Sequence, residues 1–176
     1  MSEPFNLAKL TLILGGANSG KSLFAEQLLS SCSSKVYLAT AQPFDQEMTE
    51  KIYQHKQRRD QNWTTIEEPI LLSQKLMMLN EEKAYSVILI DCITLWVSNL
   101  MIHKLKIDQE FVKFVDIVKN TKIPIVIVSN EVGMSIIPDN ELARSFRAYV
   151  GQLNQYLAAA ALRVYWVVAG IGTIIK

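Results

Sequence analysis

The segment "LTLILGGANSGKS", residues 10 to 22, constrains the fold of this chain more than any other stretch. Its first part is apolar and predicts a buried strand at Leu10–Leu14. Gly15 follows, then four residues, then Gly20, Lys21 and Ser22, which is the spacing of a phosphate-binding loop that opens a helix. Glycines let backbone N–H groups surround a phosphate without Cβ clashes, and the helix directs its positive end at the same anion. The segment therefore predicts a nucleotide-binding domain of the α/β class.

The residues of this loop have expected roles. Lys21 reaches the β- and γ-phosphates of a nucleotide, and the hydroxyl of Ser22 can bind Mg²⁺. The predicted phosphate-binding residues are Gly15, Gly16, Ala17, Asn18, Ser19, Gly20, Lys21 and Ser22.

The rest of the chain alternates between short apolar runs and helical patterns. Further strands are predicted at Lys35–Thr40, Val87–Asp91, Ile123–Ser129 and Val164–Ala169. Helices are predicted at Lys21–Ser31, Gln46–Arg59, Ile70–Leu79, Gln109–Asn120 and Asn140–Ala161. Because the strands are almost continuously apolar, we expect a mainly parallel sheet with helices on both faces. A last short strand, Gly172–Ile175, is expected to pair antiparallel at the edge.

Composition narrows the function classes. The 176 residues are 49% hydrophobic and 20% charged, which suits one nucleotide-binding domain over residues 1–176. A net charge of +1 provides no global field for binding nucleic acid. Arg163 and Gly170 interrupt the longest apolar stretch, so we expect no membrane span and a cytoplasmic location. Cys32 and Cys92 match no metal or redox spacing and are expected to be free thiols.

Several polar residues are expected at the carboxyl edge of the sheet. Asp91 ends the apolar run "SVILID", where a carboxylate can hold Mg²⁺ directly or through water. The predicted nucleotide contacts after the second strand are Thr40, Ala41 and Gln42. Glu67 and Glu131 are further candidates, with a loop or capping role as the alternative for each.

The stretch "IYQHKQRRD" places His55 among basic residues. His55, Lys56 and Arg59 share one face of the predicted helix, and Lys51 and Arg58 add to the charge. Neighbouring cations disfavour protonation of an imidazole. A neutral imidazole beside a phosphate site can attack phosphorus while the cations stabilise the developing negative charge. The alternative is an ordinary solvated helix face, which is what we expect around the other histidine, His103.

These segments together resemble the adenosylcobinamide kinase/adenosylcobinamide-phosphate guanylyltransferase family over nearly the whole chain. The resemblance rests on "GGANSGKS", "YLATAQPFDQEM", "HKQRR" followed by "WTTIEEP", "IDCITLWVSNL", and "VSNEVGMSIIPDNELARSFRAYVGQLNQ" with "VVAGI" near the end. The order and spacing of these blocks also agree with the family. The resemblance implies a RecA-like P-loop NTPase domain, a transferase activity and a homotrimer.

The resemblance also implies roles for individual residues. His55 matches the histidine that becomes guanylylated, and Lys21 is the catalytic lysine of the loop. The implied nucleotide contacts outside the loop are Thr40, Ala41, Gln42, Lys56, Gln57, Arg58, Arg59, Glu67 and Asp91. Ser22 and Asp91 would bind Mg²⁺. The implied substrates are ATP, GTP, adenosylcobinamide and its phosphate, with no nucleic-acid partner.

The sequence departs from the family at three places. Asn18 stands where the family often has Arg, Leu162–Arg163 replace the usual acidic residue, and the stretch after Asp91 is shorter than in some relatives. These departures affect substrate affinity or assembly and spare the chemical positions. Two other interpretations stay open from the residues alone: a small-molecule P-loop kinase without a covalent step, and a RecA-like regulatory ATPase. Arg144 and Arg147 could contact either the corrinoid or a neighbouring subunit.

Overall fold

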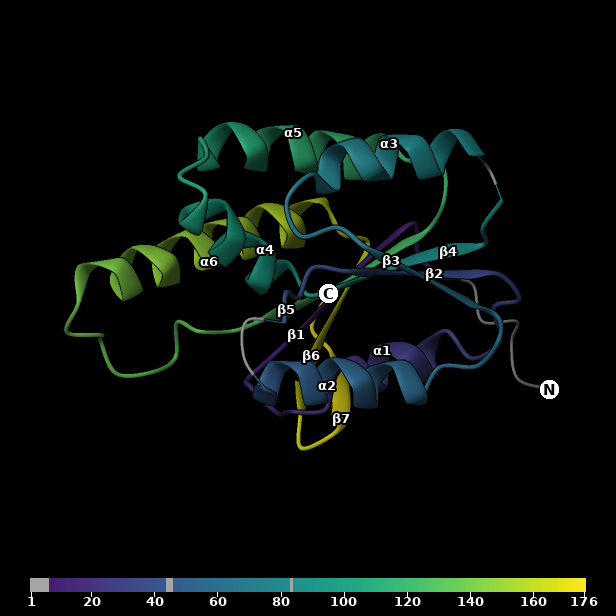
Figure 1. The fold of residues 1–176 in the computed structure, drawn as a ribbon, viewed down its shortest axis with the longest axis horizontal. Helices are drawn as coiled ribbons and strands as arrows, with labels where there is room; N and C mark the ends of the chain where they lie inside the picture. Colours follow the sequence, from purple (N-terminus) through teal and green to yellow (C-terminus); the bar gives the residue numbers. More distant parts are fainter. Residues whose placement is uncertain (1–6, 44–45, 83) are drawn as a thin grey trace.

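The computed structural model describes residues 7–43, 46–82 and 84–176 (Figure 1). Its strands are β1 (Leu10–Gly15), β2 (Lys35–Ala39), β3 (Trp63–Glu67), β4 (Val87–Asp91), β5 (Ile125–Asn130), β6 (Arg163–Val168) and β7 (Ile171–Ile174). Its helices are α1 (Lys21–Leu28), α2 (Gln46–Gln57), α3 (Leu72–Glu82), α4 (Ile93–Ile102), α5 (Ile107–Asn120) and α6 (Glu141–Ala160).

The strands form one sheet in the order β3-β2-β4-β5-β1-β6-β7. Every neighbouring pair is parallel except β6 and β7, which pair antiparallel at one edge. Because β1 lies between β5 and β6, the loop that follows it opens in the middle of the carboxyl edge. The predicted mainly parallel sheet with an antiparallel edge strand is confirmed.

Helices cover both faces of the sheet. α3, α4, α5 and α6 lie on one face, and α1 and α2 lie on the other (Figure 1). The alternation of side chains along β1 produces this division, since Leu12 packs into the core below α3–α6 while Ile13 packs with Ala25 of α1. Each strand in the centre is therefore buried on both sides, which explains its continuous apolar sequence.

Two elements were not predicted from the sequence. β3 at Trp63–Glu67 is a half-exposed edge strand, and its sequence "WTTIE" carries too little apolar character to stand out. α4 at Ile93–Ile102 is apolar on nearly all sides because it lies between β5, α5 and α6, so it lacks the one-sided pattern of a surface helix. None of the helices in the described ranges is long and apolar enough to cross a membrane.

The largest fully buried side chain of the core is Trp96 on α4. Its ring lies against Phe114, with 4.9 Å between centroids, and its Nε1 donates a hydrogen bond to the carbonyl of Ile70 at 2.7 Å. The ring contact joins α4 to α5, and the hydrogen bond joins α4 to the loop before α3.

We expect Trp96→Ala to lower the free energy of unfolding by about 3–5 kcal/mol, because a large buried aromatic leaves a cavity and an unpaired carbonyl. Urea denaturation followed by circular dichroism would measure the change. Trp96→Phe serves as the control, since it loses the hydrogen bond but fills most of the space, and it should cost clearly less. Equal losses in the two variants would contradict the packing argument.

Candidate active site

A cavity of about 700 Å³ opens at the carboxyl edge of the sheet between the phosphate loop, the ends of β2, β3 and β4, and α2. Most of the predicted nucleotide contacts line it. They are Ala17, Asn18, Ser19, Gly20, Lys21, Ser22, Ala41, Lys56, Arg58, Arg59, Glu67 and Asp91. Segments far apart in the sequence thus meet in one site of a size that suits a nucleotide.

Five predicted contacts do not line this cavity: Gly15, Gly16, Thr40, Gln42 and Gln57. Thr40 is fully buried, donates a hydrogen bond to the carbonyl of Cys92 at 2.7 Å, and accepts one from the backbone N–H of Cys92 at 3.0 Å. Its position therefore fixes β2 against the end of β4. Cys32 and Cys92 are both free thiols, as predicted.

The phosphate loop has the backbone that its glycines predict. Gly20 has φ 90°, and an added Cβ there would lie 3.0 Å from Cα of Gly170. At Gly15 an added Cβ would collide with the carbonyl oxygen of Val167 and lie 2.7 Å from Oγ of Ser19. The loop is also supported from β6–β7, because the N–H of Gly170 donates to the carbonyl of Ser19 at 2.8 Å. Both glycines are therefore required by close approach.

Lys21 begins α1, and only 6% of its surface is exposed. Its Nζ donates to the carbonyl of Gly16 and lies 3.4 Å from Oγ of Ser19. Burial lowers the pKa of Lys21, whereas Asp91 and Cys92 raise it. A partly desolvated ammonium held inside a glycine loop has few competing partners and is well placed to bind phosphate oxygens.

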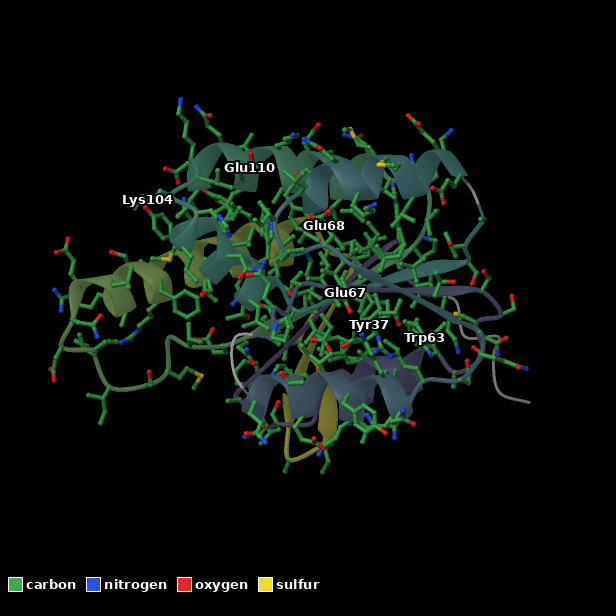
Figure 2. The ribbon with its side chains drawn as sticks, viewed as in Figure 1. Tyr37, Trp63, Glu67, Glu68, Lys104 and Glu110 are labelled. Carbon is green, nitrogen blue, oxygen red and sulfur yellow. The ribbon has the colours of Figure 1, made fainter. Side chains whose placement is uncertain are left out.

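Asp91 ends β4 and accepts a hydrogen bond from the hydroxyl of Tyr37, with 2.8 Å between the oxygens. Burial and the neighbouring carboxylate hold the pKa of Tyr37 well above its usual value, so the phenol stays a donor. Figure 2 shows Tyr37 and Trp63 on the side of the sheet that faces α1 and α2. Asp91 and Ser22 line the same cavity, and a carboxylate with a hydroxyl suits Mg²⁺, which prefers oxygen ligands and fills its remaining positions with water and phosphate.

We expect Asp91→Asn to raise the Mg²⁺ concentration required for half-maximal activity by roughly tenfold or more, as losing even an indirect ligand contact does. The fold should persist, because the amide keeps the volume and its oxygen can still accept from Tyr37. A magnesium titration of nucleotide turnover would show the shift. Asp116→Asn, an exposed carboxylate on α5, is the matched control. An unchanged magnesium requirement would remove Asp91 from the metal site.

Three basic residues at the end of α2 contact the rest of the domain: Lys56 in the last turn, and Arg58 and Arg59 directly after the helix. Lys56 pairs with Glu67 at 2.7 Å, and Arg58 lies 3.6 Å from Glu26. The guanidinium of Arg59 stacks on the ring of Tyr37, with 3.6 Å from Cζ to the ring centroid. His55 belongs to α2, but its side chain lies outside the part of the chain that the structure describes. His103 is exposed at the end of α4, as predicted.

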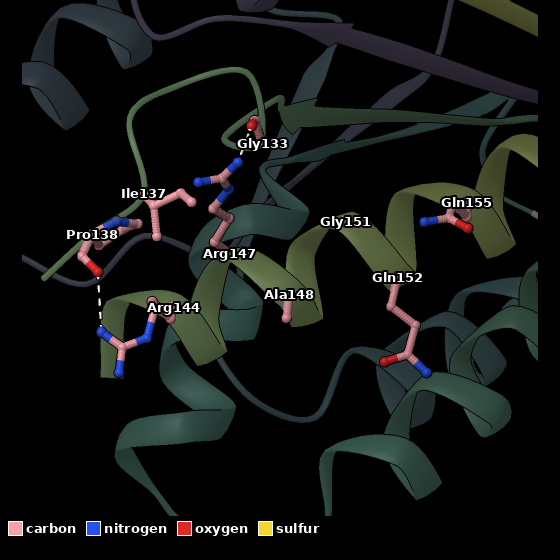
Figure 3. A pocket seen from close by; sticks show the side chains of 9 residues that line it. All are labelled: Gly133, Ile137, Pro138, Arg144, Arg147, Ala148, Gly151, Gln152 and Gln155. Carbon is pink, nitrogen blue, oxygen red and sulfur yellow. Dashed lines mark hydrogen bonds between the residues drawn. The ribbon is translucent and has the colours of Figure 1, made fainter. Parts of the chain in front are cut away.

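Arg144 and Arg147 lie elsewhere, in a second hollow between the loop 133–138 and α6 (Figure 3). Arg144 donates to the carbonyls of Pro138 and Asp139 at 3.1 and 2.6 Å, and Arg147 donates to the carbonyl of Gly133. Glu131 accepts from the N–H of Gly133, so its carboxylate caps the loop and does not line the first cavity. These contacts give all three side chains a role in shaping the loop.

Sequence reasoning missed some residues that line the site. They include Leu23, Tyr37, Ala39, Pro43, Thr49, Ile52, Cys92, Leu95, Val128 and Asn130. Tyr37 is the most informative of them, because it joins Asp91 to Arg59. The only feature of the sequence that points to Tyr37 is that a side chain with a hydroxyl stands in the middle of the apolar strand β2.

Comparison with known proteins connects this geometry to a family. Solved structures of the flagellar accessory protein FlaH from Methanocaldococcus jannaschii (17% identity, TM-score 0.52, 97% of this chain and 79% of that one) and of the RadB recombinase (14%, 0.54, 91% and 74%) share the fold. They confirm the predicted RecA-like P-loop architecture.

Much closer sequences are the bifunctional adenosylcobalamin biosynthesis proteins CobU of Escherichia coli K12 and CobP of Pseudomonas aeruginosa PAO1. The first is 36% identical over 95% of this chain and 99% of its own length, and the second is 39% identical over 91% and 93%. Residues 11–175 match the family described as cobinamide kinase / cobinamide phosphate guanyltransferase. The chain belongs to this cobinamide kinase / cobinamide phosphate guanyltransferase family.

Proposed function

We propose that this protein phosphorylates adenosylcobinamide with ATP or GTP and then transfers GMP from GTP to the product, giving adenosylcobinamide-GDP. One observation carries the proposal. In a chain of this family, a single cavity joins the buried Lys21 and the carboxylate of Asp91 to the basic end of the helix that bears His55. Phosphoryl transfer needs the cation of Lys21 in the phosphate loop, and guanylyl transfer needs in addition cations around the α-phosphate, which the basic end of the helix supplies.

In the first half-reaction the hydroxyl of the aminopropanol arm of adenosylcobinamide attacks the γ-phosphorus. Its oxygen forms a bond to phosphorus as the bond to the β,γ-bridging oxygen breaks, the nucleoside diphosphate leaves, and the hydroxyl proton is released to solvent. Lys21 stabilises the charge on the transferred group, and the glycine loop excludes side chains from the phosphates. Mg²⁺, held by Ser22 and Asp91, would supply further neutralisation of the phosphate charge.

In the second half-reaction a nitrogen of His55 attacks the α-phosphorus of GTP and pyrophosphate leaves. The phosphate oxygen of adenosylcobinamide phosphate then attacks the same phosphorus, and the phosphorus–nitrogen bond breaks. Neutral imidazole is the required form, and the cations of Lys56, Arg58 and Arg59 around the cavity favour it. The same cations stabilise negative charge on the transferred phosphate.

The test uses GTP that carries its label on the α-phosphate. Purified protein with GTP and Mg²⁺ should become covalently labelled, and added adenosylcobinamide phosphate should discharge the label into adenosylcobinamide-GDP. A label on the product but never on the protein would contradict the covalent step and favour a P-loop kinase without it. Nucleotide hydrolysis without any corrinoid product would favour a regulatory ATPase.

We propose that residues 1–176 act as one transferase domain, which the single sheet supports. A cytoplasmic location fits an enzyme that consumes ATP and GTP. The homotrimer implied by the sequence resemblance is checked by sedimentation equilibrium of the purified protein.

A further inference from the structure

Glu26 carries a largely buried carboxylate that the proposed reaction does not use. It lies on α1, one helical turn after Ser22, and only 9% of its side chain is exposed. Burial raises the pKa of Glu26, while the nearby arginines lower it. Removing a carboxylate from water is costly unless a charged partner compensates. The partner of Glu26 therefore indicates what the side chain is for.

That partner follows α2 directly. The Nη2 of Arg58 lies 3.6 Å from Oε1 of Glu26, and the Arg58 side chain remains 40% exposed. This distance is too long for a good hydrogen bond, and Oε1 has no hydrogen-bond partner among the described residues. The interaction is thus an ion pair between the phosphate-loop helix and the chain that leaves α2.

Arg59, the residue after Arg58, links this ion pair to the cavity. Arg59 stacks on Tyr37, whose hydroxyl binds Asp91, and the Nε and Nη1 of Arg59 are buried without a hydrogen-bond partner among the described residues. Glu26 attracts Arg59 electrostatically as well as Arg58. Buried donors without a partner are costly, and an anion bound in this cavity would satisfy them. Both arginines line the cavity, whereas Glu26 does not.

A second ion pair, between Lys56 and Glu67, joins α2 to the end of β3 and is more exposed to solvent. Lys56 and Glu67 are 45% and 59% exposed, and exposed ion pairs typically contribute about 0–1 kcal/mol. The pair between Glu26 and Arg58 is longer, but its carboxylate is shielded from solvent, which reduces the screening of the interaction. His55 lies three residues before Arg58 in the sequence. A change in the ion pair between Glu26 and Arg58 would therefore also move α2, the helix that carries His55.

We infer that Glu26 is a positioning residue for guanylyl transfer, which acts through Arg58 and Arg59 to hold α2 and its His55 against the phosphate loop. The inference rests on the proposed function of His55. Attack on the α-phosphorus depends on the placement of α2, whereas γ-phosphate transfer depends on Lys21 and the loop itself. A positioning role therefore affects the two half-reactions unequally.

The experiment compares Glu26→Gln with wild type at saturating GTP. The variant keeps the side-chain volume, so we expect the rate of covalent GMP attachment to fall about tenfold or more while adenosylcobinamide phosphorylation stays within about twofold, given the steep distance dependence of attack. Glu26→Asp, which keeps the charge, should recover part of the rate. Glu50→Gln, the same change at an exposed position of α2, is the matched control. A proportional loss of both activities would overturn the inference.

A double-mutant cycle with Arg58→Gln tests the path. If Glu26 acts through Arg58, the double variant should be no slower in GMP attachment than the slower of the two single variants; additive losses would overturn this path. Hydrogen exchange of residues 46–59 provides a readout that needs no guanylylation, and it should rise in Glu26→Gln. If wild-type protein acquires no covalent label, the proposed guanylyl transfer is contradicted, but the role of Glu26 in holding α2 is not. If hydrogen exchange of residues 46–59 is the same in Glu26→Gln as in wild type, the role of Glu26 is contradicted, but the guanylyl transfer is not.

Discussion

Replacing His55 with alanine should abolish covalent labelling of the protein by α-labelled GTP while leaving substantial phosphorylation of adenosylcobinamide. The imidazole is the nucleophile of the guanylyl step, and methyl offers no substitute. Transfer of the γ-phosphate uses Lys21, at the start of α1, and the glycine loop between β1 and α1, none of which belongs to α2. The two activities should therefore separate in one variant.

Both assays are needed on His55→Ala, together with His103→Ala as the matched control. His103 is the other histidine of the chain and lies exposed at the end of α4, so its loss should leave labelling intact. The wild-type label should be lost in acid and retained in base, as expected of a phosphorus–nitrogen bond. Labelling that persists in His55→Ala, or a label stable to acid, would exclude His55 as the nucleophile.

Replacing Lys21 with alanine should collapse both half-reactions. Nζ of Lys21 is the buried cation inside the phosphate loop, and both reactions place a triphosphate in that loop. Removing one preorganised electrostatic contact typically costs about 100- to 1,000-fold in rate, and we expect each activity to fall by at least roughly 100-fold. Initial rates of kinase and guanylyl transfer at saturating nucleotide would measure the two losses.

Lys113→Ala provides the control for this experiment, because Lys113 is an exposed lysine on α5. Thermal unfolding should confirm that Lys21→Ala is still folded. If one activity survived at the wild-type rate, the two reactions would not share the phosphate loop, and the single-cavity arrangement would be wrong.

The fold was largely predictable because its central strands are buried on both faces. β4 was predicted at its observed bounds, and β1 and β2 were predicted to within one residue. A short continuous apolar run between polar turns is typical of a strand that is buried on both faces. β3 was missed because an edge strand is solvated and its residues need not be apolar. α4 was missed for the opposite reason, as burial on nearly every side removes the helical periodicity.

The site was predictable where chemistry fixes both residue type and spacing. The phosphate loop meets that condition, and so does the strand-end carboxylate of Asp91. Thr40 was expected in the site, yet its hydroxyl binds the backbone of Cys92, a use that nothing in the local sequence shows. Tyr37 and Glu26 were missed because their importance depends on partners from other elements, Asp91 and Arg58. Tertiary proximity of this kind has no local signal.

The place of β1 in the sheet has a consequence for how the chain acquires its shape during synthesis. β1 pairs with β5 and β6, which begin at Ile125 and Arg163, so the strand emerges from the ribosome long before either neighbour exists. Partners so distant in sequence make pairing slow and leave an apolar strand exposed meanwhile. The turn at Gly170 that supports the phosphate loop is made later still. The most recognisable part of the sequence is thus translated well before the strands and the turn that complete its surroundings.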